Sequence, residues 1–300
     1  MTAKKATRKK PLIGFIGQGY VGGSYANNFE KRGFKVVRYS LEPLYVANKH
    51  KIKQCDIVFV CLPTPTTPKG FDASIVAEGL SLVGKGKIAV IKSTMLPGMT
   101  GKLQKKYKNA IVLCSPEFLS VSTAQEDADN PFSNVIGLAA DTPRHRKAAE
   151  AVLKILPRAP FSQITSAEEA ELIKYAHNMS GYTQILTFNA IYDLALHFNS
   201  DWAKIQRAIE ADPLVCNRYS NPLHKSGRGA GGACFIKDFA AFSKLYGETV
   251  ARPEGIKYLR ASEMKNIALR IETNKDRQLL KDVYGHKRIG KHISRAKKKR

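Results

Sequence analysis

The chain has 300 residues, of which 43% are hydrophobic, enough to bury one large core or two ordinary ones. No apolar run is long enough to cross a bilayer, and the charged opening MTAKKATRKK is not followed by the apolar segment of a secretory signal. The five cysteines form no C-x-x-C pair and no metal-ligand spacing. We therefore expect a cytoplasmic protein with reduced cysteines, no membrane contact and no bound metal.

A net charge of +24 favours anionic partners, and much of this charge lies at the two ends. Residues 1–10 carry five Lys or Arg and residues 284–300 carry eight, with no acidic residue in either segment, which leaves +11 on the rest of the chain. We interpret the two segments as solvated, disordered basic tails. Nucleic acid or another acidic surface is a candidate partner for them.

The first predicted elements surround a glycine-rich turn. An apolar strand ends in G-Q-G-Y-V-G, an amphipathic segment follows, and FKVVRY supplies a second strand. This is the context of a dinucleotide-binding turn, in which free N–H groups at a helix N-terminus bind the pyrophosphate. The predicted cofactor contacts are Gly17, Gln18, Gly19, Tyr20, Val21 and Gly22.

The end of the second strand bears on the choice of cofactor. An NAD site usually has an acidic residue there, on the ribose hydroxyls. This chain has Arg38, Tyr39 and Ser40, with Glu42 two residues further on. Ser40 is a candidate ribose contact, and a serine beside an arginine also accommodates a 2′-phosphate. The sequence favours NAD and leaves NADP open.

Further apolar strands alternate with helical patterns. We predict strands within 55–63, 87–94, 109–117 and 133–140, and helices at about 72–84, 97–107 and 142–156. This alternation predicts an α/β fold with a Rossmann-type, doubly wound parallel sheet. Ligands of such sheets lie beyond the carboxyl ends of the strands. The candidates at those ends are Pro63, Thr64, Ser93, Thr94, Ser115 and Glu117.

The second half is predicted to be helical, with a long central helix. Residues 165–212 contain no proline, and Ser166 with Glu169 forms a capping box at the start. Lys174 and Asn178 are four residues apart, so they share one face of this helix. They could hold a substrate oxygen and a water, or be an ordinary exposed lysine and asparagine. A helix of this length often packs on a second subunit, so we expect a homodimer.

Residues 227–238, GRGAGGACFIKD, place small residues around Cys234. Glycine is needed where backbone or ligand approaches closely or where φ is positive. Lys237 and Asp238 follow one turn later. A structural cysteine would sit among large apolar residues, so this stretch predicts a reactive thiol.

Taken together, the chain resembles the UDP-glucose/GDP-mannose dehydrogenase family. The resemblance rests on the following stretches, in the family's order: GFIGQGYVG, CLPTPTTPKGFDAS, STMLPGMT, SPEFLSVSTAQEDADNPFSNVIG, AELIKYAHN and GAGGACFIKD. It covers residues 11 to about 245. It implies the oxidation of a nucleotide-sugar C6 hydroxyl to a carboxylate with two molecules of NAD.

The resemblance also implies roles for individual residues. Cys234 would attack the intermediate aldehyde as a thiolate, which Lys174, Lys237 or a helix N-terminus after Phe235 would favour. Lys174 and Asn178 would stabilise oxyanions and position water, Asp238 would orient Lys174 or the water, and Glu117 would act as a general base. Thr94 would lie between cofactor and substrate. The implied substrate contacts are Phe118, Leu119, Arg218 and Lys225, and Lys237 is a further candidate cofactor contact.

The chain departs from the family pattern in ways that shape the predicted organisation. Val121 stands where the family commonly has a second glutamate, and we expect a shortened form without the third domain that covers the nucleotide half of the substrate. The predicted segments are a basic tail at 1–10, a dinucleotide-binding domain at 11–164, a helical domain at 165–283 and a basic tail at 284–300.

Two other interpretations stay open. A two-electron β-hydroxyacid dehydrogenase shares the Rossmann domain, the long helix and a Lys-x-x-x-Asn pair, but it leaves GGACFIKD unexplained. A non-enzymatic family member that binds nucleic acid or an assembly would agree with Val121 and the net charge of +24. Retention of Cys234, Lys174, Asn178, Glu117 and Asp238 favours an enzyme.

Overall fold

The computed structural model describes residues 10–225 and 227–297, and it forms two compact units. The first unit comprises Met1–Thr64 and Ala73–Lys174, and the second comprises Pro65–Asp72 and Tyr175–Arg300. The predicted boundary at 164/165 therefore differs from the structure in two ways. The first eight residues of the long helix belong to the first unit, and a short segment of the first half belongs to the second.

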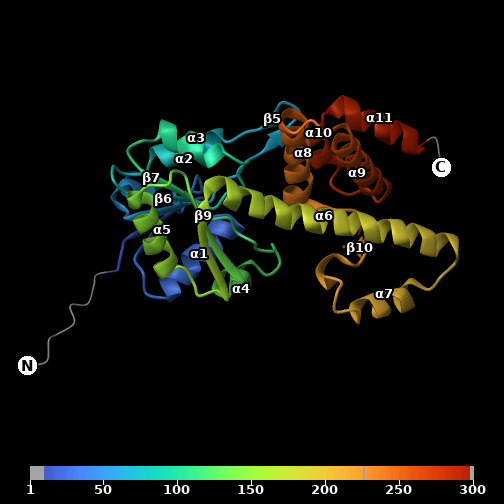
Figure 1. The fold of residues 1–300 in the computed structure, drawn as a ribbon, viewed down its shortest axis with the longest axis horizontal. Coiled ribbons are helices and arrows are strands. Elements are labelled where there is room, and N and C mark those ends of the chain that lie inside the picture. The colour runs from blue at the N-terminus through green and yellow to red at the C-terminus, as the bar shows by residue number, and fades with distance from the viewer. Residues whose placement is uncertain (1–9, 226, 298–300) are drawn as a thin grey trace, which may run out of the picture. The chain divides into compact units, whose positions relative to one another are not determined.

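The first unit is built on a seven-stranded sheet (Figure 1). The strands, in spatial order, are β2 (Val36–Tyr39), β1 (Ile13–Ile16), β3 (Ile57–Val60), β6 (Ile88–Ile91), β7 (Ile111–Cys114), β8 (Ser133–Leu138) and β9 (Phe161–Ser166). The first five are parallel, as predicted. The predicted doubly wound fold is thereby confirmed.

The direction of β8 is the exception within this parallel-dominated sheet. β8 pairs with β7 in the antiparallel direction, and β9 continues parallel to β8. The only helix between β7 and β8 is α4 (Ala124–Asp129), whose six residues span about 9 Å. A parallel neighbour needs a crossover that returns along the sheet, usually through a longer helix, and this connection does not provide one.

Helices cover both faces of the sheet. α1 (Tyr20–Lys31), α4 and α5 (Pro143–Ile155) pack on one face, and α2 (Ser74–Ser81) and α3 (Met99–Lys106) lie on the other (Figure 1). A 3-10 helix, Val46–Gln54, connects β2 to β3. Alternate strand residues point to opposite faces of the sheet. Because helices cover both faces, the residues of each central strand are apolar in both directions. This explains the continuous apolar runs in the sequence.

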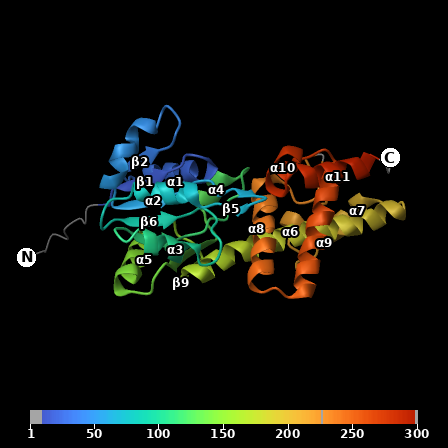
Figure 2. The same ribbon diagram turned by 90° about the horizontal axis from the view of Figure 1, so that it is seen from above.

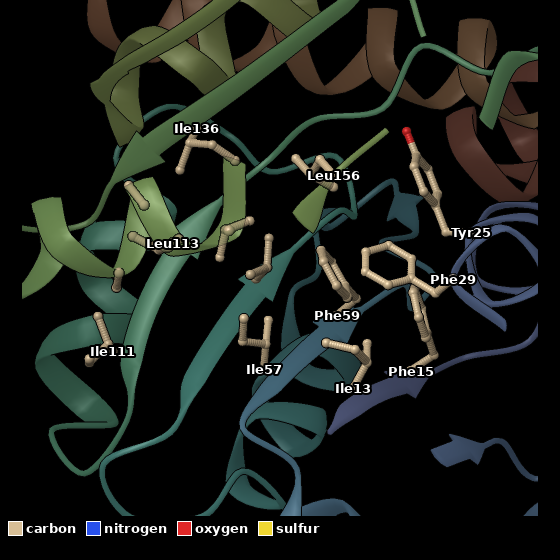
Figure 3. Packing of buried hydrophobic residues seen from close by; sticks show 14 of the residues in the cluster. Ile13, Phe15, Tyr25, Phe29, Ile57, Phe59, Ile111, Leu113, Ile136 and Leu156 are labelled. Atoms are coloured by element: carbon tan, nitrogen blue, oxygen red, sulfur yellow. The ribbon is translucent and has the colours of Figure 1, made fainter. Parts of the chain in front are cut away.

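Aromatic rings fill the core between α1 and the sheet (Figure 3). Phe15 and Phe59, from neighbouring strands, stack with their ring centroids 4.9 Å apart. Phe29 of α1 packs against both at 5.6 and 5.3 Å. These contacts fix α1, and therefore its N-terminus, on the carboxyl side of β1.

The second unit consists of helices and two small hairpins (Figure 2). Its elements are β4 (Thr66–Thr67), β5 (Gly70–Phe71), the rest of α6 (Ala167–His197), α7 (Trp202–Glu210), a 3-10 turn (Asn217–Tyr219), β10 (Leu223–His224), β11 (Gly227–Arg228), α8 (Gly232–Thr249), α9 (Pro253–Glu272), α10 (Arg277–Tyr284) and α11 (His286–Lys297). Tyr182 of α6 stacks on Phe239 of α8, with ring centroids 3.8 Å apart. The predicted long helix is confirmed.

The capping box at the start of α6 is also present. The backbone N–H of Glu169 donates to the Ser166 hydroxyl at 3.2 Å, and the N–H of Ser166 donates to the Glu169 carboxylate at 2.9 Å. The Thr165 hydroxyl donates to the same carboxylate. These hydrogen bonds lower the pKa of Glu169.

The C-terminal segment differs from the disordered tail that we predicted. Residues His286–Lys297 form α11, and Ile289 is fully buried against Ile267 and Leu280. One apolar residue in each of the first turns is enough to anchor a helix whose other residues are mostly basic. Residues 1–9 and 298–300 of the predicted tails lie outside the described residues.

None of the helices in the described part of the chain is both long and apolar enough to span a membrane. Within the same residues, no group of three or more His, Cys, Asp or Glu side chains is arranged to hold a metal ion.

Candidate active site

The glycine turn after β1 has the shape that a pyrophosphate requires. A Cβ on Gly17, where φ is +92°, would lie 2.2 Å from the carbonyl oxygen of Cys61, and one on Gly22 would lie 2.0 Å from that of Gly17. A Cβ on Gly19 would meet no atom within 4 Å. The first and third glycines therefore pack the turn against β3 and α1, and the second leaves room for a ligand. Among the described residues, the buried side-chain carbonyl oxygen of Gln18 has no hydrogen-bond partner.

The end of β2 favours NAD over NADP. The Arg38 guanidinium donates two hydrogen bonds to the Glu30 carboxylate, at 3.0 and 2.6 Å, and one to Asn27. Its charge is thus already paired with α1. Ser40 is half-buried directly after the strand, and its hydroxyl accepts from the N–H of Glu42.

The predicted candidates after β3 and β6 lie together. The Ser93 hydroxyl accepts from the N–H of Leu62 at 2.9 Å and donates to the Leu62 carbonyl at 2.6 Å. The Thr64 hydroxyl donates to the carbonyl of Thr94 at 2.9 Å. Pro63 between them is exposed. These bonds cross-link the two strand ends, so Thr94 is held on a rigid edge of the sheet.

Glu117 and Lys174 form a buried ion pair beside this edge. The Lys174 ammonium donates to the Glu117 carbonyl at 2.7 Å and to its carboxylate at 3.2 Å, and the two side chains are only 6% and 7% exposed. The same carboxylate accepts from the N–H of Leu119 at 2.6 Å. The centroid of the Phe118 ring lies 5.5 Å from the Lys174 ammonium. Val121, which stands where the family commonly has a second glutamate, is 72% exposed. The valine therefore does not replace an acid at a buried position.

Sequence reasoning missed one charged residue of this region, Lys92. It follows β6 directly, is 3% exposed, and donates to the carbonyl and the hydroxyl of Ser115 at 3.2 and 3.3 Å. Burial lowers the pKa of Lys92 from 10.5 to about 8. A lysine that continues a wholly apolar strand to its carboxyl end is the signal that the sequence offered.

Cys234 lies in the first turn of α8. The helix begins at Gly232, two residues before the cysteine rather than after Phe235 as predicted. Its Sγ is a thiol, as in all five cysteines of the chain. Cys234 is half-buried, and Gly232 and Ala233 before it are exposed. The N-terminal turn of a helix favours a negative charge.

Asp238 connects α8 to α6 in the second unit. Its buried carboxylate accepts from the Asn178 amide at 2.7 Å and from the Lys237 ammonium at 2.5 Å. Asp238 and Lys237 form an ion pair with each other, and Asp238 also orients Asn178. The sequence did not indicate either contact.

Side chains of α9 hold the glycine loop that precedes Cys234. The Asn266 amide donates to the carbonyl of Ala230 at 2.9 Å, and its carbonyl accepts from the N–H of Ala230 at 2.7 Å. Arg270 donates to the carbonyl of Arg228 at 3.1 Å and pairs with Asp276. A Cβ on Gly229 would lie 2.7 Å from Asn266. This glycine therefore serves close backbone packing.

The predicted substrate contacts Arg218 and Lys225 are both exposed in the segment between α7 and α8. Arg218 precedes Tyr219, whose ring lies 5.6 Å from that of Phe235, the neighbour of Cys234. Lys225 has a left-handed backbone with φ of 50°. Their binding role stays a prediction.

A cavity of about 650 Å³ opens elsewhere in the second unit, between the β4–β5 hairpin and α8, α9, α10 and α11. Lys244, Arg260 and Arg288 line it, together with Glu248 and Glu263. None of the predicted site residues contributes to its wall.

The glycine turn after β1 and the linked strand ends are those of a dinucleotide-binding domain of the Rossmann class. Two family models match this chain. Residues 42–156 match the NAD binding domain of the UDP-glucose/GDP-mannose dehydrogenase family, and residues 168–268 match its central domain. The chain belongs to this family, and NAD is the cofactor that the first match supports.

Individual proteins are also similar to this chain. An uncharacterised protein of Methanocaldococcus jannaschii is 30% identical over 274 residues, which cover 77% of this chain and 30% of that protein. A UDP-glucose 6-dehydrogenase of Haloferax volcanii is 26% identical, over 76% of this chain and 64% of its own. The chain thus spans less than two thirds of either relative. The solved UDP-glucose dehydrogenase of Pyrobaculum islandicum shares the fold, with a TM-score of 0.74, 24% identity and coverage of 95% of this chain and 73% of its own.

Proposed function

We propose that this protein oxidises the C6 hydroxyl of a nucleotide sugar, of the UDP-glucose type, to a carboxylate in two steps. Two molecules of NAD, held one after the other at the turn from Gly17 to Gly22, would each accept one of the two hydrides. The first step removes a hydride and a proton from the alcohol and leaves an aldehyde. The reaction removes four electrons in all.

The chain's own residues carry the chemistry of the second step. The Cys234 thiolate adds to the aldehyde carbon and forms a carbon–sulfur bond, and the resulting thiohemiacetal loses a hydride and a proton to become a thioester. Water then cleaves the carbon–sulfur bond, which releases the carboxylate and restores the thiol. Asn178 and Lys174 are proposed to stabilise the oxyanions, and Glu117 to accept a proton from the water.

One observation carries this proposal: Cys234 stands in the first turn of α8, four residues before Asp238, which holds Asn178. A thiol, an amide donor and a buried carboxylate are thereby brought to neighbouring turns of two packed helices. A two-electron dehydrogenase needs no thiol there. The family match supports the same substrate class.

The test is the stoichiometry of NADH formation with UDP-glucose, GDP-mannose and an N-acetylated UDP-sugar, each with NAD and with NADP. We expect two NADH per nucleotide sugar with the wild type. Cys234→Ser should abolish the second oxidation, because serine is a far weaker nucleophile than a thiolate. Cys216→Ser, at the exposed cysteine of the same unit, is the matched control and should leave the stoichiometry at two.

The other outcomes assign other functions. One NADH per substrate molecule with Cys234→Ser unaffected would place the protein among two-electron dehydrogenases. Binding of NAD without turnover of any nucleotide sugar would favour a non-enzymatic role.

We also propose that the protein is a homodimer. The last turn of α6 and the residue directly after it expose Leu194, Leu196 and Phe198 at 58%, 54% and 71%, which is an unusual concentration of apolar surface. Leu194→Asp should shift the protein to a monomer in analytical ultracentrifugation. Leu41→Asp, at an exposed leucine of the first unit, should not.

A polyanion is a second proposed partner. Lys287, Arg288 and Lys291 are exposed on α11, and their charge adds to that of the adjoining basic residues. Salt-dependent retardation of RNA or DNA in a gel, lost on charge reversal of these two lysines and one arginine, would support such binding. Retardation that survives this change would place the contact elsewhere.

A further inference from the structure

We propose that Lys92 is a positioning residue of this active site: its buried ammonium fixes the segment from Ser115 to Glu117 and, through it, the ion pair between Glu117 and Lys174. The inference rests on the proposed function for the roles of Glu117 and Lys174 toward substrate. It assigns a task to a residue that does not itself touch substrate.

The contacts of Lys92 hold its side chain in one place. Its ammonium has three N–H groups, and three partners surround it: the carbonyl and the hydroxyl of Ser115, and the face of the Tyr25 ring, whose centroid lies 4.3 Å away. Tyr25 comes from α1, and Ser115 directly follows β7. The ammonium therefore ties the end of β6 to the end of β7 from beneath the surface.

A buried ammonium in this position needs an explanation beyond packing. The strand before it, Ile88–Ile91, is apolar, and lysine is rarely buried to this extent because its charge loses hydration. A methionine would fill the same space without that cost. What the lysine adds is charge and directed hydrogen bonds, both aimed at the segment that carries Glu117.

Two features transmit the position of Ser115 to the ion pair. Pro116 separates Ser115 from Glu117, and its ring restricts the backbone between them. Lys174 then contacts Glu117 twice, at the carbonyl and at the carboxylate. A shift of the segment would displace both acceptors of Lys174 together.

The charge of Lys92 interacts with a small set of neighbouring groups. Those that face it are Tyr25 from α1, Cys61 after β3, Cys114 at the end of β7, Glu117 in the following loop and Lys174 from α6. Burial raises the pKa of Cys61 to about 12 and those of Cys114 and Tyr25 further, so these three stay neutral while Lys92 titrates. Glu117 and Lys174 are left to respond to its charge.

The first test measures turnover of the nucleotide sugar by the wild type, Lys92→Met and Lys92→Arg. A displacement of about 1 Å in an active site costs roughly 100-fold, so we expect Lys92→Met to lower kcat about 10- to 100-fold with little change in KM. Lys92→Arg, which keeps the charge, should recover part of the loss. Ser115→Ala removes one acceptor and leaves the carbonyl, so it should have a smaller effect.

Lys87→Met is the matched control. Lys87 lies just before the same strand at its opposite end, where it pairs with Asp56 at 2.8 Å on the surface. This variant should keep the wild-type kcat. Equal losses in Lys87→Met and Lys92→Met, or a wild-type kcat in Lys92→Met, would overturn the proposal.

The pH profile separates positioning by charge from mere support of the fold. As the pH rises through about 8, Lys92 loses its charge, and the wild type should approach Lys92→Met in kcat. The kcat of the wild type divided by that of Lys92→Met should therefore fall as the pH rises above about 8. A ratio that is constant with pH would contradict the proposed action of the charge.

If the wild type oxidises none of the nucleotide sugars, the proposed function is refuted but the positioning role of Lys92 is not. A measurement that does not depend on activity then tests that role. Urea unfolding of Lys92→Met, Glu117→Gln and the double variant gives the coupling between the two residues. Non-additive changes in the free energy of unfolding would support the positioning role. Additive changes would overturn it.

Discussion

The side-chain amide of Asn178 on α6 donates a hydrogen bond of 2.7 Å to the buried carboxylate of Asp238 on α8. The same carboxylate pairs with Lys237, so a single acidic group holds both a polar donor and a cation. The residues come from two motifs that are 60 positions apart in the sequence. Their junction orients the face of α6 that the proposed reaction uses.

Asp238→Asn should therefore weaken both stability and turnover. The change removes the negative charge from Lys237 and presents an amide to Asn178, and breaking a largely buried pair costs about 3 kcal/mol. Urea unfolding should show this loss, and kcat should fall about 100-fold. Asp282→Asn, at an exposed residue of α10, should change the free energy of unfolding by less than about 0.5 kcal/mol.

Asn266→Ala should loosen the glycine loop before Cys234. The substitution leaves the N–H and the carbonyl of buried Ala230 without partners, which costs about 2 kcal/mol. We expect a lower urea midpoint and slower formation of the second NADH, because the loop sets the start of α8. Gln278→Ala, on the exposed side of α10, serves as the control. Wild-type stability of Asn266→Ala would show that the loop is held by other contacts.

Two glycines of the dinucleotide turn should respond differently to alanine. Gly17→Ala places a Cβ 2.2 Å from a backbone oxygen at positive φ, so both the fold and NAD binding should suffer. Gly19→Ala meets no atom within 4 Å, so the unfolding curve should match the wild type. NAD affinity, measured by calorimetry, should nevertheless fall at least about 10-fold, because the methyl group occupies the path of the pyrophosphate. Unchanged affinity in Gly19→Ala would place the cofactor elsewhere.

Glu171 should make stability depend on pH. Its buried carboxylate accepts from the N–H groups of Gly98 and Thr100, at 2.6 and 2.9 Å, and burial raises its pKa above the usual 4.5. In the window between 4.5 and the raised pKa, the folded state binds more protons than the unfolded state. The contribution of Glu171 to stability is therefore present below the window and is lost as the pH rises through it.

The measurement is the free energy of unfolding against pH for the wild type and Glu171→Gln. The difference between the two curves should decline with rising pH in that window. Glu168→Gln, at an exposed residue of the same helical turn, is the control. A difference that grows with pH would contradict the assignment.

Several features of the fold followed directly from local sequence. The turn at Gly17, the apolar strands and the box of Ser166 with Glu169 each depend on residues only a few positions apart, and the structure contains all three. The polar residues after β3, β6 and β7 could be placed at one edge because parallel strands end together. Hydrogen bonds join the residues after β3 to those after β6.

Other features depend on contacts that no local pattern encodes. The reversal of β8 depends on how far its connection returns along the sheet. A single lysine after an apolar strand is ordinarily a surface residue, so this signal in the sequence was weak for Lys92, and its contacts with Ser115 and Tyr25 show its burial. Asn266 and Arg270 lie 36 and 42 residues beyond the loop residues that they bind. The basic composition of α11 concealed the buried Ile289.

The β4–β5 hairpin has a consequence for how the chain matures. It belongs to the second unit, where the carbonyl of Lys69 accepts from the Lys244 ammonium across 175 residues of sequence. During synthesis this hairpin leaves the ribosome long before α8 exists, so its docking must wait for nearly the whole chain. Such a late, long-range closure is slow to form and makes the helical half dependent on eight residues of the other half. A fragment that begins at residue 175 would therefore lack the β4–β5 hairpin, which is part of the second unit.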